Sequence, residues 1–144
     1  LRAALVSAQE ADLTLVDEIP DGLPLVMGDL RRLGQVLDNL LQNAIKFSHP
    51  GGSITIRMRE EGLGIRTEVQ DTGIGIPADQ LPRVFDRFYQ VDGTTTRRFG
   101  GTGLGLAIVK QIVEAHNGEV GVESEERQGS LFYFIIPKAN AERE

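Results

Sequence analysis

The sequence contains no cysteine, only two histidines and no long apolar run in its 144 residues. Without cysteine, disulfides and thiolate metal sites are excluded. No apolar segment approaches the roughly 18 residues of a membrane-spanning helix, and no secretory signal is visible. Acidic side chains outnumber basic ones by 21 to 15, which gives a formal net charge of −6. We therefore expect a cytoplasmic protein that binds neither nucleic acid nor an anionic membrane.

The length suits one domain that buries a real core, because 144 residues without a linker, repeat or low-complexity segment leave no place for a boundary. The chain opens on Leu1 rather than methionine, so we expect a fragment of a longer parent. Strands and helices are mixed without strict βαβ alternation, which favours an α+β two-layer sandwich. The predicted elements are helices over 1–11, 29–47 and 104–116, short helical stretches over 78–88, strands over 13–19, 25–27, 53–59, 65–71, 119–124 and 130–136, a mobile loop over 89–102, and a frayed tail from 138.

The helix predicted over 29–47, with Asp29 as its N-cap, has two opposite faces. One face holds Asn39, Asn43 and Lys46 at positions i, i+4 and i+7. A solvated face would explain them, yet asparagine is a poor residue for a helix interior. Amide oxygens suit Mg²⁺, and a lysine one turn further on reaches phosphate oxygens. The opposite, apolar stripe comprises Leu30, Leu33, Leu37, Leu40, Leu41 and Ala44.

Asp71 stands at the end of an apolar row. Period two places it on one strand face with Ile65, Thr67 and Val69. A buried carboxylate is costly unless a donor satisfies it, and an adenine amino group is one such donor. The alternative is that Asp71 opens the turn at 71–73 and accepts hydrogen bonds from the local backbone. The residues alone leave both interpretations open.

Two glycine-rich segments carry the features of close ligand contact. Gly73 and Gly75 let the backbone approach a flat ligand. Glycines at 100, 101, 103 and 105 stand where a loop enters a helix, and helix N-termini attract phosphates. Leu106 and Ala107 follow Gly105, which excludes a Walker A loop, and the polar segment 94–99 excludes a dinucleotide-binding fingerprint.

Taken in order, four segments resemble the signature boxes of sensor histidine kinases. NLLQNAIKF at 39–47 resembles the N box, DTGIGIP at 71–77 the first glycine box, FDRFY at 85–89 the F box and GTGLGLAI at 101–108 the second glycine box. The resemblance implies the Bergerat-type ATP-binding fold of the gyrase, heat-shock-90, histidine kinase and MutL (GHKL) superfamily. In that α+β fold a mixed, mostly antiparallel sheet packs on about three helices. It also implies one catalytic domain over 1–144, with an ATP lid over about 85–102.

The resemblance implies a protein-histidine kinase domain that binds ATP and Mg²⁺ and phosphorylates a histidine on a separate dimerisation domain of the same kinase. A response regulator would then receive the phosphoryl group in two-component signalling. The acceptor domain would precede Leu1, so we expect a monomeric fragment, inactive in autophosphorylation, from the cytoplasmic part of a homodimeric parent. The alternatives are a non-catalytic nucleotide-binding module and a GHKL ATPase or serine kinase.

The same resemblance implies the site residues. Catalysis would rest on Asn39, Asn43, Lys46 and Arg87, and Mg²⁺ on Asn43 with Asn39. The nucleotide would contact Asn43, Lys46, Phe47, Asp71, Gly73, Gly75, Ile76, Phe88, Arg97, Arg98, Gly101, Thr102, Gly103, Leu104 and Gly105.

Two departures from related patterns bear on the chemistry. Gln90 stands where family members often carry an arginine that contacts the terminal phosphate, so Arg87, Arg97 or Arg98 would take that role. Asn39 stands where gyrase-like ATPases place a glutamate that activates water, and an amide is no general base, which favours phosphoryl transfer over hydrolysis. His49 and His116 lack the following acidic residue typical of acceptor histidines, so we expect both to be structural.

Overall fold

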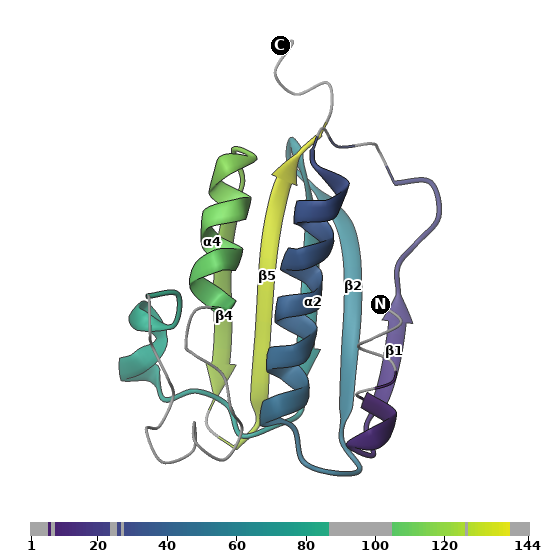
Figure 1. Cartoon of the computed structure of the whole chain (residues 1–144), viewed down its shortest axis with the longest axis vertical. Coiled ribbons are helices and arrows are strands. Elements are labelled where there is room, and N and C mark those ends of the chain that lie inside the picture. The colour runs from purple at the N-terminus through teal and green to yellow at the C-terminus, as the bar shows by residue number, and fades with distance from the viewer. Residues whose placement is uncertain are drawn as a thin grey trace.

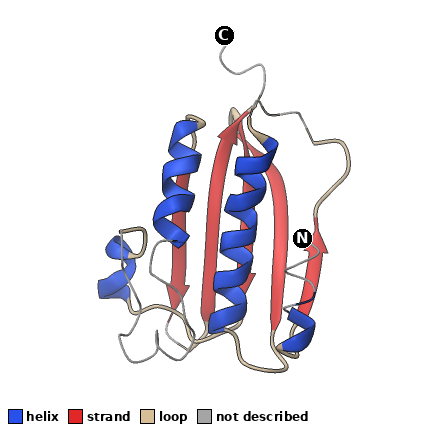
Figure 2. Cartoon of the chain, in the orientation of Figure 1, coloured by secondary structure: helices blue, strands red, loops and turns tan. Residues whose placement is uncertain are grey.

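The computed structural model describes residues 6, 8–23, 26, 28–86, 105–125 and 127–138. Its five-stranded sheet has the order β1-β2-β3-β5-β4, with β1 parallel to β2 and the remaining pairs antiparallel. Helices α2 and α4 lie together over one face of this sheet (Figure 1), and colouring by secondary structure separates the two layers (Figure 2). The predicted α+β sandwich with a mixed, mostly antiparallel sheet is confirmed. The elements are β1 (Thr14–Glu18), α2 (Leu30–Phe47), β2 (Ser53–Glu61), β3 (Gly64–Asp71), the 3-10 helix η1 (Ala78–Arg83), α4 (Gly105–Ala115), β4 (Glu119–Glu125) and β5 (Gly129–Pro137).

Helix α2 begins and ends where the sequence predicts. Asp29 caps it, because its Oδ1 accepts hydrogen bonds from the backbone N–H groups of Arg31 (3.0 Å) and Arg32 (3.2 Å). At the other end Ser48 is extended and its hydroxyl donates to the Ala44 carbonyl at 2.7 Å. These two caps fix where α2 begins and ends.

The core-facing stripe of α2 is centred slightly differently from the prediction. Val36, which the predicted stripe omitted, is fully buried, whereas Leu33 and Leu37 are only partly buried. Val36 lies one turn before Leu40 and shares its direction, so it occupies the centre of the stripe while the two leucines flank it. Leu40, Leu41 and Ala44 are buried as predicted, and the side chain of Leu30 lies outside the described part of the chain.

The sheet supplies the other half of the core through alternate residues. The predicted row on β3 is confirmed, because Ile65, Thr67, Val69 and Asp71 are all buried. The buried residues of the neighbouring strands and of α4 are Ile54, Ile56, Phe132, Phe134, Ile136, Val109, Ile112 and Val113. Asp71 is therefore the last residue of a row that otherwise lies within the helix–sheet interface.

Helix α4 ends at the predicted asparagine and glycine. Asn117 has a φ of 62°, its N–H donates to the Glu114 carbonyl at 3.0 Å, and the Gly118 N–H donates to the Val113 carbonyl at 2.9 Å. His116, just before this turn, places Nδ1 2.8 Å from the Ile112 carbonyl and accepts the Asp29 N–H on Nε2 at 3.0 Å. The expected structural role of His116 is thus confirmed: it joins the end of α4 to the start of α2.

Some predicted boundaries fall elsewhere. Lys138 is not frayed as predicted, because its N–H donates to the Leu63 carbonyl at 2.8 Å and it forms an antiparallel bridge with Val26. That bridge is the described part of the strand predicted over 25–27. Of the short helical stretches predicted over 78–88, the described part contains the 3-10 helix η1, in which Pro82 donates no hydrogen bond. Residues 1–5, 87–104 and 139–144, with the predicted mobile loop, lie outside the described residues.

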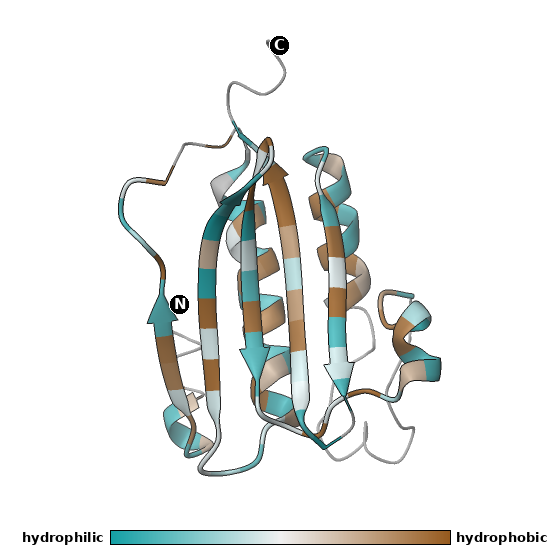
Figure 3. Cartoon of the chain, turned by 180° about the vertical axis from the view of Figure 1, so that it is seen from behind, coloured by the Kyte–Doolittle hydropathy of each residue, from teal (hydrophilic) through white to brown (hydrophobic). Residues whose placement is uncertain are grey.

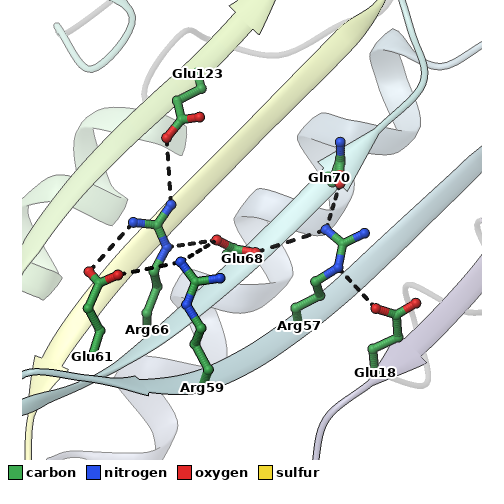
Figure 4. Close-up of polar contacts among 8 residues, drawn as sticks. All are labelled: Glu18, Arg57, Arg59, Glu61, Arg66, Glu68, Gln70 and Glu123. Carbon is green, nitrogen blue, oxygen red and sulfur yellow. Dashed lines mark hydrogen bonds and ion pairs between the residues drawn. The ribbon is translucent and has the colours of Figure 1, made fainter.

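Figure 3 views the sheet from the side away from the helices, and this face carries a cluster of paired charged side chains. Glu68, only 5% exposed, accepts Arg66 Nε at 2.7 Å and lies within 4 Å of Arg57 and Arg59 (Figure 4). The Arg66 guanidinium also stacks 3.8 Å from the ring centre of Tyr133. Burial lowers the pKa of Arg66, but Glu68, Glu61 and Tyr133 together raise that pKa above its usual value. None of the described helices is both long and apolar enough to cross a membrane.

Candidate functional site

Three segments converge where β3 ends: the C-terminus of α2, the loop after Asp71 and the start of β5 (Figure 1). We call residues 72–77 the glycine loop. The register of the sheet brings β5 beside the end of β3, with Gln70 opposite Leu131. The hydrogen bonds described below join all three segments, so the first glycine box and the end of the N box meet in one site.

Asp71 is held as an acceptor in a buried position. It is 4% exposed, and its Oδ1 accepts the N–H groups of Gly73 at 2.9 Å and Ser130 at 3.3 Å. Burial raises the pKa of the Asp71 carboxyl, and the two backbone hydrogen bonds lower it by less, so the net pKa lies above its usual value. The turn interpretation is confirmed, because Asp71 accepts the Gly73 N–H, and Asp71 also belongs to the buried core-facing row. Its contact with an adenine amino group stays a prediction.

Backbone hydrogen bonds from both sides fix the glycine loop. The Ile74 N–H donates to the Phe47 carbonyl at 3.1 Å, and the Ile74 carbonyl accepts the Arg127 N–H at 2.6 Å. The Ile76 N–H donates to the Ser124 hydroxyl at 2.8 Å. Gly75 has a φ of 72°, in the left-handed region that favours glycine. The loop is therefore clamped between the end of α2 and the β4–β5 hairpin.

Gly73 allows the loop to lie against the end of α2. A Cβ built on it would overlap the Phe47 carbonyl oxygen and lie 3.0 Å from Ser48 Cα. Both neighbours are backbone and cannot move aside without shifting α2.

We expect Gly73→Ala to lower the free energy of unfolding by about 2 kcal/mol or more, because a backbone clash in a packed site is not relieved by side-chain rotation. Gly34→Ala is the matched control. Gly34 is exposed in α2 with nothing within 4 Å of an added Cβ, so there the change should stabilise the chain by up to about 1 kcal/mol. Urea unfolding of both variants gives the comparison, and equal effects of the two substitutions would contradict the packing argument.

The polar face of α2 extends from Gly105, at the start of α4, to the glycine loop. Asn39, Asn43 and Lys46 are each half-buried. The Asn39 Nδ2 donates to the Gly105 carbonyl at 3.3 Å, where α4 starts, while Phe47 contacts the glycine loop. At 1.5 Å per residue, Asn39 and Phe47 are separated by about 12 Å along the helix. This face therefore connects the start of α4 to the glycine loop and could line an elongated ligand.

A metal ion here would depend on amide oxygens. Within the described residues no group of three or more histidine, cysteine, aspartate or glutamate side chains could hold one. Asn43 and Asn39 offer hard oxygen atoms, which suit Mg²⁺ when substrate phosphates complete its coordination. The donor set thus fits a magnesium ion that arrives with a phosphorylated ligand.

The described residues among those predicted lie along α2, at the end of β3 and in the glycine loop, and at the start of α4: Asn39, Asn43, Lys46, Phe47, Asp71, Gly73, Gly75, Ile76 and Gly105. The remaining predicted contacts lie outside the described residues: Arg87, Phe88, Arg97, Arg98, Gly101, Thr102, Gly103 and Leu104.

Sequence reasoning missed the contribution of the β4–β5 hairpin to this site. Gly129 has a φ of 118°, and a Cβ on it would overlap the Asp71 carbonyl oxygen. Ser130 donates its N–H to the Asp71 carboxylate, and Ser124 accepts the Ile76 N–H. A glycine directly before a strand was an available signal for close backbone approach, but it reads equally well as an ordinary hairpin turn.

A family model described as "Histidine kinase-, DNA gyrase B-, and HSP90-like ATPase" matches residues 28–140. That range includes both helices, the glycine loop and four of the five strands. The chain belongs to this family of ATPase-type domains. Its relatives place it more closely, among the catalytic domains of sensor histidine kinases.

Two curated relatives are histidine kinases of two different organisms. The chain is 43% identical over 131 residues to the sensor histidine kinase WalK of Bacillus subtilis, and 43% identical over 129 residues to the circadian input-output histidine kinase CikA of Synechococcus elongatus. Each match covers 90% of this chain but only 21% and 17% of the relative, respectively. The chain therefore spans about a fifth of the length of these relatives.

Solved structures agree in fold as well as sequence. The mycobacterial sensor histidine kinase MprB superposes with a TM-score of 0.81 at 31% identity, covering 96% of this chain and 92% of that one. The catalytic domain of histidine kinase ThkA gives 0.79 at 32% identity, covering 99% and 92%. Full-length ShkA in complex with AMPPNP gives 0.82 at 34% identity, covering 96% and 29%. The resemblance to the sensor histidine kinase catalytic domain, and its fold, are confirmed.

Proposed function

We propose that this chain binds Mg-ATP and transfers the γ-phosphoryl group to a histidine on a separate dimerisation domain of its parent kinase. The observation that carries the proposal is Asp71, a buried carboxylate whose Oδ1 accepts two backbone N–H groups. Both of its hydrogen bonds within the described residues end on Oδ1, and we assign to Oδ2 the role of accepting from the ligand. An adenine amino group is a donor of the right kind, and it would repay the desolvation of the carboxylate.

The base lies, in this proposal, against the glycine loop and beside the end of α2, which already contact each other through the Ile74 N–H and the Phe47 carbonyl. Neither Gly73 nor Gly75 carries a side chain, and the loop's hydrogen bonds hold it before any ligand arrives. Phe47 supplies an aromatic side chain at the same end of α2, and Ile76 an apolar one. A preformed flat site of this kind loses little entropy on binding, because its backbone is already ordered.

The triphosphate then extends along the polar face of α2 toward the start of α4. Lys46 supplies a positive charge, and Asn43 and Asn39 would hold Mg²⁺ through their amide oxygens. Bound there, Mg²⁺ neutralises charge on the phosphate oxygens. The N-terminus of α4 at Gly105 adds the positive end of a helix dipole. We assign the remaining nucleotide contacts to Arg87, Phe88, Arg97 and Arg98 of a lid over about 85–102, and to residues 101–104.

In the transfer a ring nitrogen of the acceptor histidine bonds to the γ-phosphorus as the bond from that phosphorus to the β,γ-bridging oxygen breaks. ADP leaves with the electron pair of that bond, and the histidine carries the phosphoryl group. Such a reaction needs positioning and charge neutralisation more than a general base, which fits an amide at Asn39. His116 is a poor acceptor, because both of its ring nitrogens are engaged within the fold.

The acceptor is therefore expected on another domain, and a response-regulator aspartate would receive the phosphoryl group from it. We propose that residues 1–144 form one catalytic domain that is monomeric alone and acts in a homodimeric parent. Because ATP is its substrate, the domain would work on the cytoplasmic side.

The test mixes this chain with the parent's dimerisation domain and γ-labelled ATP. We expect acid-labile, base-stable label on the acceptor histidine, and no label on this chain alone. ATP binding with no label on the acceptor would support a non-catalytic nucleotide module, the alternative that Gln90 suggests. Sustained phosphate release without any acceptor would support an ATPase instead. Absence of ATP binding to the chain would overturn the proposal altogether.

A further inference from the structure

The hydroxyl of Ser124 joins three polar groups at the point where β4, β5 and the glycine loop meet. Its Oγ accepts the Ile76 N–H at 2.8 Å, lies 2.9 Å from the Ser130 Oγ and donates to the Gly129 carbonyl at 2.9 Å. Ser124 is on β4, in the row that points toward the helices, opposite Ser130 in the register. It is the side chain through which the hairpin reaches the far end of the glycine loop.

These contacts use the full capacity of a hydroxyl. A serine has one proton to donate and two lone pairs to accept with. Donation to Gly129, with acceptance from Ile76 and from the Ser130 hydroxyl, satisfies all three at once. The orientation of the hydroxyl is therefore fixed by its partners, unlike that of a surface serine.

The same hairpin also holds the other end of the loop. The Ser130 N–H donates to Asp71 Oδ1, and Gly129 lies against the Asp71 and Thr72 backbone. Asp71 and Ile76, at the two ends of the loop, are thus both hydrogen-bonded to the β4–β5 hairpin. Among these contacts, the hydrogen bond from the Ile76 N–H to Ser124 is the one that joins the loop backbone to a side-chain hydroxyl. A substitution at Ser124 can therefore remove this hydrogen bond without changing the main chain.

We infer that Ser124 is a positioning residue for base recognition: it holds the glycine loop in register with Asp71. This inference rests on the proposed binding of ATP and deepens it. Without the hydroxyl, the Ile76 N–H, at a residue only 6% exposed, loses its acceptor. The loop would then shift or open to water, and the base would lose the fixed floor that presents it to the carboxylate.

The test compares Ser124→Ala with Ser124→Thr, which keeps the hydroxyl, and Val120→Ala, which removes packing from the same strand away from the loop. For each variant of the 144-residue chain we would measure the Kd of ATP and of ITP, which lacks the amino group, and the exchange rate of the Ile76 amide without nucleotide. We expect Ser124→Ala to weaken ATP binding about tenfold and ITP binding by less, and to increase the exchange rate of the Ile76 amide. Ser124→Thr should restore both properties.

Val120→Ala separates positioning from general destabilisation. It should lower the free energy of unfolding with ATP affinity and the Ile76 amide unchanged. Equal ATP affinity in wild type and Ser124→Ala, or an equal loss for ATP and ITP, would overturn the inference. An unchanged exchange rate of the Ile76 amide in Ser124→Ala would also overturn the inference, and this readout does not require the chain to bind ATP. If the wild-type chain bound no ATP, that result alone would overturn the proposed function. A loss in Val120→Ala matching that in Ser124→Ala would reduce Ser124 to a structural role.

Discussion

Asp71→Asn is expected to weaken ATP binding roughly 100-fold, about 2.7 kcal/mol, without unfolding the chain. Asparagine keeps an oxygen where Oδ1 accepts the Gly73 and Ser130 N–H groups, so the turn should survive. At Oδ2 it places an N–H₂ group, which would face the amino group of the base as donor against donor. The charged hydrogen bond is lost and a repulsive contact takes its place.

The same substitution should have the opposite effect on stability. Burial raises the pKa of Asp71, so the folded chain binds this proton more tightly than the unfolded chain does. The contribution of Asp71 to stability is therefore full below the unfolded pKa, near 4, and is lost as the pH rises through the higher folded pKa. At neutral pH the ionised carboxylate lowers the free energy of unfolding. Nucleotide-free Asp71→Asn should then be at least as stable as wild type, with the difference shrinking as the pH falls toward 4.

Calorimetric titration with Mg-ATP and urea unfolding at a series of pH values measure both effects. Asp21→Asn, at an exposed turn, is the control and should change neither. Wild-type ATP affinity in Asp71→Asn would remove this residue from the base site. A variant that is less stable than wild type at neutral pH would show that the hydrogen bonds to the carboxylate outweigh its desolvation.

The features that the sequence predicts best are those decided within a few residues of one another. The Asp29 cap, the end of α4 at Asn117 and the row leading to Asp71 all follow from local chemistry and the period of the element, and the structure has each of them. The asparagines of α2 could be singled out because they are costly in a helix interior. Their partners, such as the Gly105 carbonyl for Asn39, could not, because 66 residues separate the two.

Sequence patterns do not predict which residues meet across the sheet. Ser124, Gly129 and Ser130 look like an ordinary hairpin until the strand order places β5 beside β3. Only then does the hairpin meet the loop after Asp71. Lys138 and Val26 are likewise joined by topology, because the bridge between them forms where the chain passes the end of β5. The centre of the α2 stripe depends on how the helix sits on the sheet, so Val36 was missed although its apolar character was plain.

The second large effect is expected at Asn43. Asn43→Ala should lower phosphoryl transfer to the acceptor by about 100-fold or more, since loss of one preorganised group at developing charge typically costs this much. Alanine is a better helix former than asparagine, so α2 should be as stable as in wild type or slightly more so. The loss should depend on the metal: ATP affinity in the presence of a chelator should match wild type, while the gain in affinity on adding Mg²⁺ should be smaller.

Gln35→Ala, at an exposed position of the same helix, is the matched control and should transfer phosphate normally. Asn39→Ala is the informative comparison, because its amide also donates to the Gly105 carbonyl. If Asn39 acts mainly through that hydrogen bond, its removal should loosen the start of α4 and weaken ATP binding with or without Mg²⁺. If it also serves the metal, the loss should depend on Mg²⁺ as at Asn43. Unimpaired transfer by Asn43→Ala would mean that the metal is held elsewhere, and the polar face of α2 would lose its assigned role.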